Sequence, residues 1–190
     1  MRWAWASSNE AWAPSCSLQG WTVGQDGHMP TRLDNDRWGY ESNCFVCEQR
    51  NAGGLQIPFQ LDDGDETVSA SFKLDATYSG APALVHGGVS LALLDEAQAW
   101  ACIAVAAKWG LTASTAADFI TPVFIDHPYR VEAQVTGVDD ALVHTVGRIV
   151  DSAGATMVSS ISTFHIVGEV DVNTGENTVD ERQQRLLGDR

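Results

Sequence analysis

Apolar and polar positions divide the chain into a regular central part and two irregular ends. Residues Leu55–Leu61 form a short strand-like run, which the turn-rich sequence Asp62–Asp65 closes. Over Thr67–Leu74 apolar residues alternate with polar ones, which is the period of a strand with one buried face. The stretch Val89–Lys108 then runs for twenty residues without Pro or Gly and is rich in Ala and Leu. The pattern therefore predicts two strands followed by one long helix.

This helix is apolar on nearly every side, so it is expected to be buried all round rather than on one face. Turn sequences at residues 137–140 and 151–154 favour hairpins. A buried helix followed by a hairpin meander is best covered by a curved antiparallel sheet, so the pattern predicts the α+β class without naming the fold. Four further strand-like runs follow the helix, at Thr112–Thr121, Tyr129–Val138, Ala141–Asp151 and Ala155–Val167.

The two ends of the chain differ from this central part. Residues 1–40 hold five of the seven tryptophans and have no sustained helical or strand period. This Trp-rich N-terminal extension is expected either to lie across the domain or a neighbouring subunit, or to be disordered. Residues 168–190 form a polar, acidic C-terminal tail with at most one short helix over Val179–Leu187. The regular domain is therefore expected to span residues 41–167.

The charge of the chain limits the classes of partner. Eleven basic and 25 acidic residues give a net charge of −14, which argues against a general nucleic-acid binder. No apolar run reaches the roughly 18 residues that a membrane span needs. The first residues lack the apolar run of a secretory signal. The sequence therefore predicts a cytoplasmic protein with neither nucleic acid nor membrane as a partner.

The segment that holds the candidate catalytic groups is Val85–Glu96. Two glycines, Gly87 and Gly88, stand just before the predicted helix, where a ligand can approach the backbone closely. The first amides of a helix have no internal partner and carry the positive end of its dipole, so they can stabilise the oxyanion of acyl transfer. Asp95 interrupts the apolar helix two turns later, and a carboxylate there needs a partner, a solvent cleft or a function.

The His86-Gly87-Gly88 turn, followed by Asp95 eight residues after Gly87, resembles the hot-dog thioesterases and in particular their phenylacetate-type, PaaI-like branch. Asp118–Pro122 is similar to the strand of that branch that ends in aromatic-x-x-Pro. Asn43–Leu55 is similar to a Cys-Phe-x-Cys segment of many bacterial relatives. The resemblance covers residues 43–167 and implies a hot-dog fold, in which a curved antiparallel sheet wraps around one long central helix.

The resemblance also implies an acyl-CoA thioesterase. The Gly87 amide would polarise the thioester carbonyl, with Gly88 beside it, and Asp95 would act as general base or as nucleophile. His86 is expected to support the turn rather than to transfer protons. Counting back from the proline places Thr112 where relatives hold a water-positioning side chain, with Ser114 as a near alternative.

Further implications concern assembly and the coenzyme. Family active sites lie at a dimer interface, so a homodimer or a dimer of dimers is expected. Arg130 and Arg148 are the candidates for binding the phosphates of CoA. Coenzyme A is part of the substrate, and no separate cofactor is expected. The alternative function is a non-catalytic hot-dog module that binds acyl-CoA or a fatty acyl group as a sensor or scaffold.

Three features need a separate interpretation. Some relatives place an Asn six residues before the motif His, where this chain has Gly80. Glu96 directly follows Asp95, and the spacing favours Asp95 as the catalytic carboxylate. Cys44 and Cys47 form a Cys-x-x-Cys pair, but no second Cys/His pair follows at a zinc-binding spacing. A packing role is therefore favoured for the two cysteines, and no metal site is expected.

Overall fold

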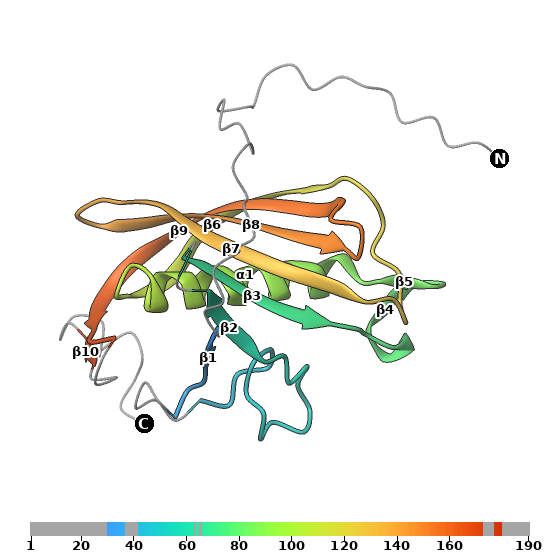
Figure 1. The fold of residues 1–190 in the computed structure, drawn as a ribbon, viewed down its shortest axis with the longest axis horizontal. Coiled ribbons are helices and arrows are strands. Elements are labelled where there is room, and N and C mark those ends of the chain that lie inside the picture. Colours follow the sequence, from blue (N-terminus) through green and yellow to red (C-terminus); the bar gives the residue numbers. More distant parts are fainter. Residues whose placement is uncertain (1–29, 37–41, 63, 65, 173–176, 180–190) are drawn as a thin grey trace, which may run out of the picture.

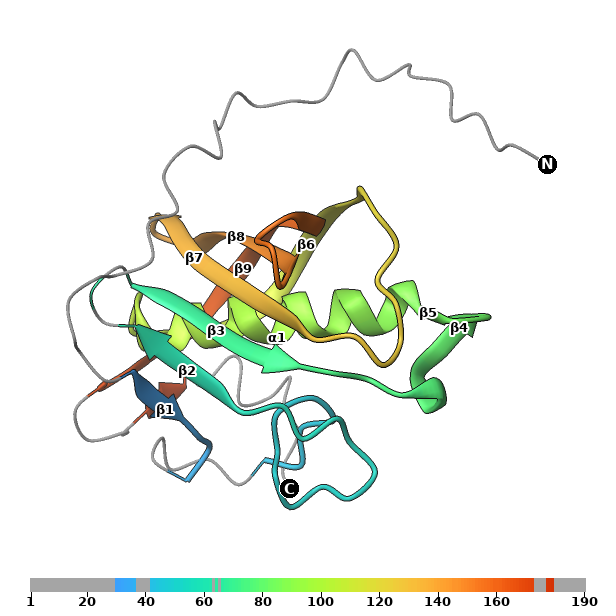
Figure 2. The same cartoon turned by 45° about the vertical axis from the view of Figure 1, so that its right-hand side comes forward.

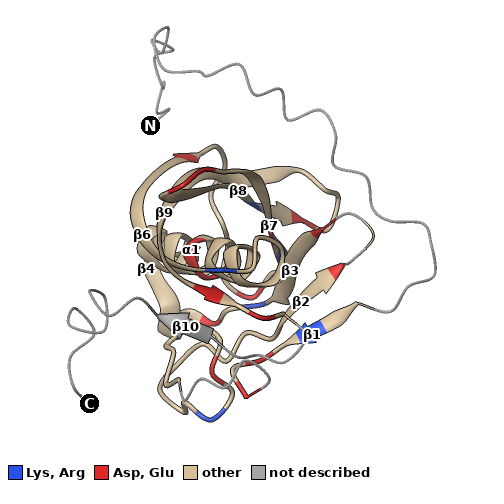
Figure 3. Ribbon diagram, turned by 90° about the vertical axis from the view of Figure 1, so that its left-hand side faces the viewer, with Lys and Arg blue, Asp and Glu red and all other residues tan. Residues whose placement is uncertain are grey.

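The structure is a computed structural model that describes residues 30–36, 42–62, 64, 66–172 and 177–179. One long helix, α1 (Gly87–Ala104), lies against a large antiparallel sheet that curves around it (Figure 1). Viewed along the helix, the strands surround α1 on most sides (Figure 3). The α+β architecture predicted from the sequence is confirmed. Among the described residues no helix is both long and apolar enough to cross a bilayer.

The main sheet has eight strands, and every pair of neighbours is antiparallel. Strand β9 pairs with β6 along one side and with β8 and β10 on the other, so β6 lies at the edge of the sheet. The remaining strands follow in the order β8-β7-β3-β2-β1. The eight strands are β1 (Thr31–Leu33), β2 (Phe59–Asp62), β3 (Thr67–Phe72), β6 (Lys108–Phe119), β7 (Tyr129–Val138), β8 (Leu142–Asp151), β9 (Thr156–Val170) and β10 (Asn177–Val179).

A small two-stranded sheet precedes the helix. It consists of β4 (Ser79–Ala81) and β5 (Leu84–Val85), and the 3-10 turn Ala76–Tyr78 leads into it. The sequence pattern does not predict these short elements, because two or three residues show no period. They deliver the chain to the start of α1, which lies beside them in Figure 2.

The long elements match their predictions most closely. Strand β7 has the predicted bounds, and β8 and β9 each begin one residue later than expected. The helix begins two residues earlier than predicted and ends at Ala104, because the chain turns sharply at Ala107, which has a φ of 56°. Strand β6 therefore begins at Lys108, inside the predicted helix. The predicted first strand is shorter, because Gln56 has a φ of 54° and interrupts the extended backbone.

Two strands lie in the segments predicted to be irregular. In the Trp-rich extension, β1 pairs with β2, with Leu33 opposite Phe59. In the acidic tail, β10 pairs with the end of β9. The sheet therefore reaches beyond residues 41–167 on both sides. The rest of the extension up to residue 29, and the short helix predicted after Val179, lie outside the described residues.

The helix fills the concave side of the sheet, as its all-round apolar sequence predicts. Leu93, Leu94 and Ala97 have no exposed surface and belong to one core cluster with residues of β3 and β7. On β7 the alternate residues Val131 and Ala133 join this core. The residues between them point to the opposite, outer face of the sheet, because side chains alternate along a strand.

Candidate active site

The helix start is held by His86, the N-cap residue of α1. Its ring Nδ1 accepts a hydrogen bond of 2.9 Å from the amide of Gly88, and its carbonyl accepts one of 2.9 Å from the amide of Val89. An acceptor at this position satisfies one of the first helical amides. No described residue accepts a hydrogen bond from the Gly87 amide. The His86 ring therefore supports the turn, and of the two glycine amides it leaves that of Gly87 available.

Gly80, which stands where some relatives have Asn, packs directly against His86. A Cβ atom at Gly80 would lie 2.9 Å from both Cα and Cδ2 of His86, which is too close for any side chain. The amide of His86 also donates a hydrogen bond of 2.9 Å to the carbonyl of Tyr78. The turn is therefore fixed by close contact with β4, and position 80 cannot hold an Asn in this arrangement.

The ring of Phe119 lies close to Gly87. A Cβ atom placed on Gly87 would lie 3.3 Å from the ring of Phe119, which stands at the end of β6. Phe119 is 55% exposed and the adjacent Ile120 is 59% exposed. These two neighbours form a small exposed apolar surface at the end of β6. The helix start thus combines an available amide with an apolar surface.

Asp95 lies further along the same helix and is bound by β6. Oγ1 of Thr112 donates a hydrogen bond of 2.8 Å to Oδ1 of Asp95. Asp95 is half-buried and Thr112 is exposed, so water can reach the pair. The structure thus brings Asp95 together with the residue that the sequence analysis placed first among the water-positioning candidates.

Ser114, the near alternative to Thr112, faces the other side of the sheet. Residues two apart on a strand normally share a face, but the pairing of β6 with β9 shifts register between Thr112 and Ser114. Thr112 lies opposite Phe164, whose side chain is buried in the interior, whereas Ser114 shares a hydrogen bond of 2.8 Å with Thr163. The irregularity therefore separates Ser114 from Asp95.

Arg130 and Arg148, the candidates for binding phosphate, lie on the outer face of the sheet. Both flank the buried Glu132 at distances of 3.3 Å and 2.7 Å, and Arg130 also donates a hydrogen bond of 3.1 Å to Ser69. The structure brings the two arginines together but does not place them beside Asp95 or Gly87. Their role in binding CoA stays a prediction.

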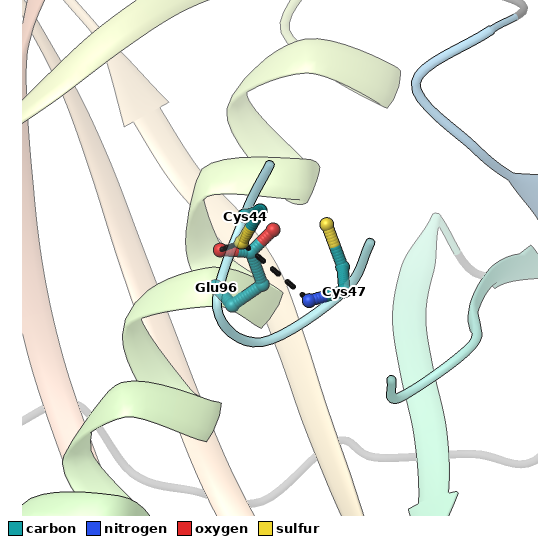
Figure 4. A group of neighbouring side chains, drawn as sticks. All are labelled: Cys44, Cys47 and Glu96. Atoms are coloured by element: carbon teal, nitrogen blue, oxygen red, sulfur yellow. Dashed lines mark hydrogen bonds between the residues drawn. The ribbon is translucent and has the colours of Figure 1, made fainter. Parts of the chain in front are cut away.

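Glu96 reaches the Cys44–Cys47 turn (Figure 4). Its Oε2 lies 3.2 Å from Sγ of Cys44, a hydrogen-bonding distance between sulfur and oxygen. Burial raises the pKa of Glu96 to about 8, and the charge of Cys44 adds to this effect. The hydrogen bond from the Cys47 thiol lowers the pKa of Cys44 to about 5, with help from the amides of Val46 and Cys47. Conversely, the bond to Cys44 and burial raise the pKa of Cys47.

Gln98 is a buried polar residue that the sequence analysis does not single out. It has no exposed surface and accepts a hydrogen bond of 2.8 Å from Thr145. It donates one of 2.8 Å to Ser160 and one of 3.0 Å to the carbonyl of Leu94. A lone amide on an apolar helix is the signal that could have found it, although its partners on β8 and β9 are visible only in the fold.

Comparisons with known proteins agree with this architecture. Residues 83–158, which include the helix and the first strands after it, match the family model of the thioesterase superfamily. Among curated proteins, a sequence search found none with significant similarity. The match begins just before the His86 turn and ends within β9, so it contains Gly87, Asp95 and Thr112.

Several solved structures share the fold. A crystallised thioesterase superfamily protein is 28% identical with a TM-score of 0.62, and the alignment covers 69% of this chain and 65% of that one. The chain thus matches just under two thirds of that relative. The Escherichia coli PaaI protein from the phenylacetic acid degradation operon is 21% identical, with a TM-score of 0.55 and coverage of 60% and 82%.

A hypothetical thioesterase from Streptococcus pneumoniae, crystallised with coenzyme A, is 14% identical with a TM-score of 0.52 and coverage of 54% and 82%. The same protein was also crystallised with one aspartate, and separately one threonine, replaced by alanine. The shared architecture confirms the hot-dog fold expected from the sequence. Together with the match of residues 83–158 to the thioesterase superfamily model, it shows that the central domain is similar to proteins of that superfamily and has the fold of PaaI.

Proposed function

We propose that the chain hydrolyses the thioester bond of acyl-CoA substrates, with the Gly87 amide and Asp95 as its reacting groups. The observation that carries this proposal is the Asp95 carboxylate on α1, which accepts a hydrogen bond of 2.8 Å from Thr112 on β6. The first amide of α1, that of Gly87, has no partner among the described residues. The Asp95 carboxylate can activate water, and the Gly87 amide can bind a developing oxyanion.

The two groups belong to one site only if two copies of the chain supply them. Gly87 and Asp95 are eight residues apart on α1, which places them roughly 12 Å apart along the helix axis. A carbonyl under attack needs its oxyanion donor and its water within about 3 Å. We therefore infer that Gly87 of one copy faces Asp95 and Thr112 of the other, in a homodimer with two equivalent sites.

The edge strand β6 is the surface best suited to this pairing. It pairs only with β9 among the described residues, so its outer edge presents backbone groups that another strand can bind. Leu111 is 42% exposed at this edge, and Phe119 and Ile120 are more exposed still. A symmetric dimer that uses β6 would bring Thr112 and the Gly87 turn of opposite copies towards each other. A dimer of dimers stays a prediction.

The proposed reaction balances without a cofactor. As a base, Asp95 takes a proton from water, and the hydroxide adds to the thioester carbonyl. The Gly87 amide stabilises the oxyanion, and its collapse breaks the carbon–sulfur bond and releases the CoA thiolate, which regains a proton. As a nucleophile, Asp95 would instead add to the carbonyl and release CoA, and water would cleave the resulting anhydride. An acyl adduct on Asp95 in acid-quenched single turnovers would establish the second route.

The relatives lend support to this substrate class. One streptococcal neighbour was crystallised with coenzyme A and another with acetyl-CoA. In this chain, Phe119 and Ile120 would line the approach to the Gly87 amide and contact the acyl or aryl group. The cytoplasmic location expected from the sequence stays a prediction.

The test is a thiol-release assay with CoA esters of short, medium, long and aromatic acids. We expect the Asp95→Asn variant to lose about 100-fold or more in kcat. Asp140→Asn is the matched control, because Asp140 is an exposed aspartate in the β7–β8 turn. Full activity of Asp95→Asn would refute the assignment. Saturable acyl-CoA binding without hydrolysis of any ester would favour the sensor.

The shared site has its own test. Gly87→Pro removes the amide hydrogen at the first helical position, where proline is tolerated. Two differently tagged chains, one carrying Asp95→Asn and one Gly87→Pro, are co-expressed. Each mixed dimer would contain one intact site, so the randomly assembled mixture should regain about a quarter of the wild-type activity. No recovery in purified mixed dimers would exclude a site built from two copies.

A further inference from the structure

Three metal-binding side chains meet at a point that the proposed thioesterase site does not use. The Sγ atoms of Cys44 and Cys47 and a carboxylate oxygen of Glu96 all lie within 4.8 Å of one another. In Figure 4 the carboxylate of Glu96, from α1, points towards the turn that carries the two sulfurs. Asp95 leaves the helix in another direction, since consecutive helical residues are about 100° apart, and it binds Thr112.

Backbone amides of the Cys44–Cys47 turn are directed at the sulfur of Cys44. The amides of Val46 and Cys47 point at Sγ of Cys44, at distances of 3.2 Å and 3.5 Å. Amide hydrogens directed at the first sulfur of a Cys-x-x-Cys turn stabilise it as a thiolate, which is the form that binds metal. A backbone hydrogen bond of 2.7 Å, which the amide of Leu55 donates to the carbonyl of Phe45, also stabilises the turn.

A close approach of the backbone makes this turn compact. A Cβ atom at Gly54 would lie 2.5 Å from the carbonyl oxygen of Phe45, so only glycine fits there. Asn51 adds two hydrogen bonds from its side-chain amide, of 3.1 Å to the carbonyl of Asn43 and 3.4 Å to that of Cys44. The glycine and the asparagine of the Cys-x-x-Cys segment therefore serve to hold the two sulfurs in place.

The cluster gathers acidic groups without a cation. Glu96 is half-buried, and none of the described Lys, Arg or His side chains forms an ion pair with it. The nearest basic group along this loop, Arg50, is paired with Glu48 and Asp36 instead. Three groups that can each carry a negative charge are thus held together, an arrangement that is unfavourable unless protons or a cation neutralise it.

We propose that Cys44, Cys47 and Glu96 bind a Zn²⁺ ion, with water as the fourth ligand. Two thiolates and one carboxylate form a donor set that suits zinc, whereas a hard cation such as Mg²⁺ or Ca²⁺ prefers oxygen alone. Tetrahedral bonds of about 2.3 Å to sulfur place sulfur atoms about 3.8 Å apart, which is compatible with ligand atoms that all lie within 4.8 Å of one another. Binding displaces the thiol and carboxyl protons to solvent and changes no oxidation state.

Solvent can reach this point. Cys47 is partly exposed and borders a cavity of about 260 Å³, and it is the one of the three proposed ligands that lines this cavity. Its walls include Trp100, one helical turn beyond Glu96, and Asn35. The ion would join two segments far apart in the sequence, the 42–57 loop and the helix that carries Asp95. Its role would be to fasten that loop to the helix.

Metal content tests the zinc proposal without reference to catalysis. The zinc proposal can therefore fail while the thioesterase proposal stands, and the thioesterase proposal can fail while the zinc proposal stands. The full chain is purified under reducing conditions, and its zinc content and zinc affinity are measured. We expect about one ion per chain. Cobalt substitution should give thiolate-to-cobalt charge transfer and the intense visible bands of tetrahedral coordination.

Ligand variants have matched controls in this chain. Cys47→Ser and Glu96→Gln should weaken zinc binding by more than the roughly 10- to 100-fold that the loss of an outer partner costs. Cys102→Ala and Cys16→Ser, which alter the other two cysteines, should leave zinc affinity unchanged. A chelator should lower the thermal midpoint of the wild-type chain, a readout that does not depend on any variant folding.

Three outcomes would overturn the proposal. The first is reduced wild-type protein that binds no stoichiometric zinc. The second is zinc binding that survives both ligand substitutions or is lost with Cys16→Ser. The third is a Cys44–Cys47 disulfide as the form with the highest thermal midpoint, because the pair would then act through oxidation rather than metal binding.

Discussion

The Oγ1 atom of Thr112 donates a hydrogen bond of 2.8 Å to Oδ1 of Asp95, and this bond joins the edge strand to the central helix. It satisfies one carboxylate oxygen and fixes the orientation of the group. The second oxygen, Oδ2, accepts no hydrogen bond from a described residue. Asp95 is therefore held in one direction while it keeps an oxygen for water or substrate.

Removing the hydroxyl of Thr112 should slow the reaction. A hydrogen bond to a charged group contributes about 1.5–3 kcal/mol, so Thr112→Val should lower kcat/KM by roughly 10- to 100-fold. Thr112→Ser keeps the hydroxyl and should retain most of the activity. Steady-state thiol release measures both variants. Ser114→Ala should have a much smaller effect on kcat/KM, because Ser114 binds Thr163 on the other face of the sheet. A larger loss in Ser114→Ala than in Thr112→Val would show that Ser114, and not Thr112, supports the reaction.

The Gly87 amide can be tested with two substitutions of similar size. His86 has a φ of −61° and a ψ of 131°, which is the conformation required before proline, so Gly87→Pro should preserve the helix start while removing the N–H. Gly87→Ala keeps the N–H and places a similar Cβ beside Phe119. We expect Gly87→Pro to lower kcat about 100- to 1,000-fold relative to Gly87→Ala, measured on folded dimers. Equal activity of the two variants would show that the amide hydrogen has no part in the reaction.

His86 is expected to act on stability rather than on proton transfer. Its Nδ1 accepts the Gly88 amide, so His86→Ala should lower the free energy of unfolding by about 1 kcal/mol. Asn is also a good N-cap residue, and His86→Asn should recover most of this loss. Urea unfolding measures the stability of both variants. If kcat falls equally in both while stability recovers only in His86→Asn, the ring has a chemical role as well.

The order of the long elements could be predicted from the sequence because their patterns are local. Strand β7 and the helix are long and strongly periodic, and the family spacing located Gly87 and Asp95 on one helix. Counting back from Pro122 in the family pattern gave Thr112, and the register shift between Thr112 and Ser114 does not disturb its bond to Asp95. Short strands such as β1 and β4 carry too few residues for a period, so their existence depends on the partners that pair with them.

The parts that could not be predicted depend on contacts between distant segments. The register shift that turns Ser114 away from Asp95 arises in the pairing with β9. The contact of Glu96 with Cys44 joins positions 52 residues apart, and a carboxylate ligand is invisible to a search for paired Cys and His. Gly80 stands where some relatives have Asn, and its close contact with His86 leaves no room for a side chain. Only the folded chain relates these positions.

The β7–β8 turn should make stability depend on pH through Asp139. The amides of Ala141 and Leu142 and the ring of His144 bond this carboxylate, and the Ala141 amide contributes most to holding its pKa below the ordinary value of 3.8. A carboxylate whose pKa is lowered on folding stabilises the protein above its unfolded pKa, and this contribution disappears as pH falls through the folded pKa. Asp139→Ala should therefore be less stable than wild type at neutral pH. The difference between their urea midpoints should narrow below pH 3.8. Asp140→Ala, in the same exposed turn, should have the urea midpoint of the wild type at every pH. A difference between Asp139→Ala and wild type that stays constant down to the lowest pH would mean that the hydrogen bonds of the turn do not depend on the charge of Asp139.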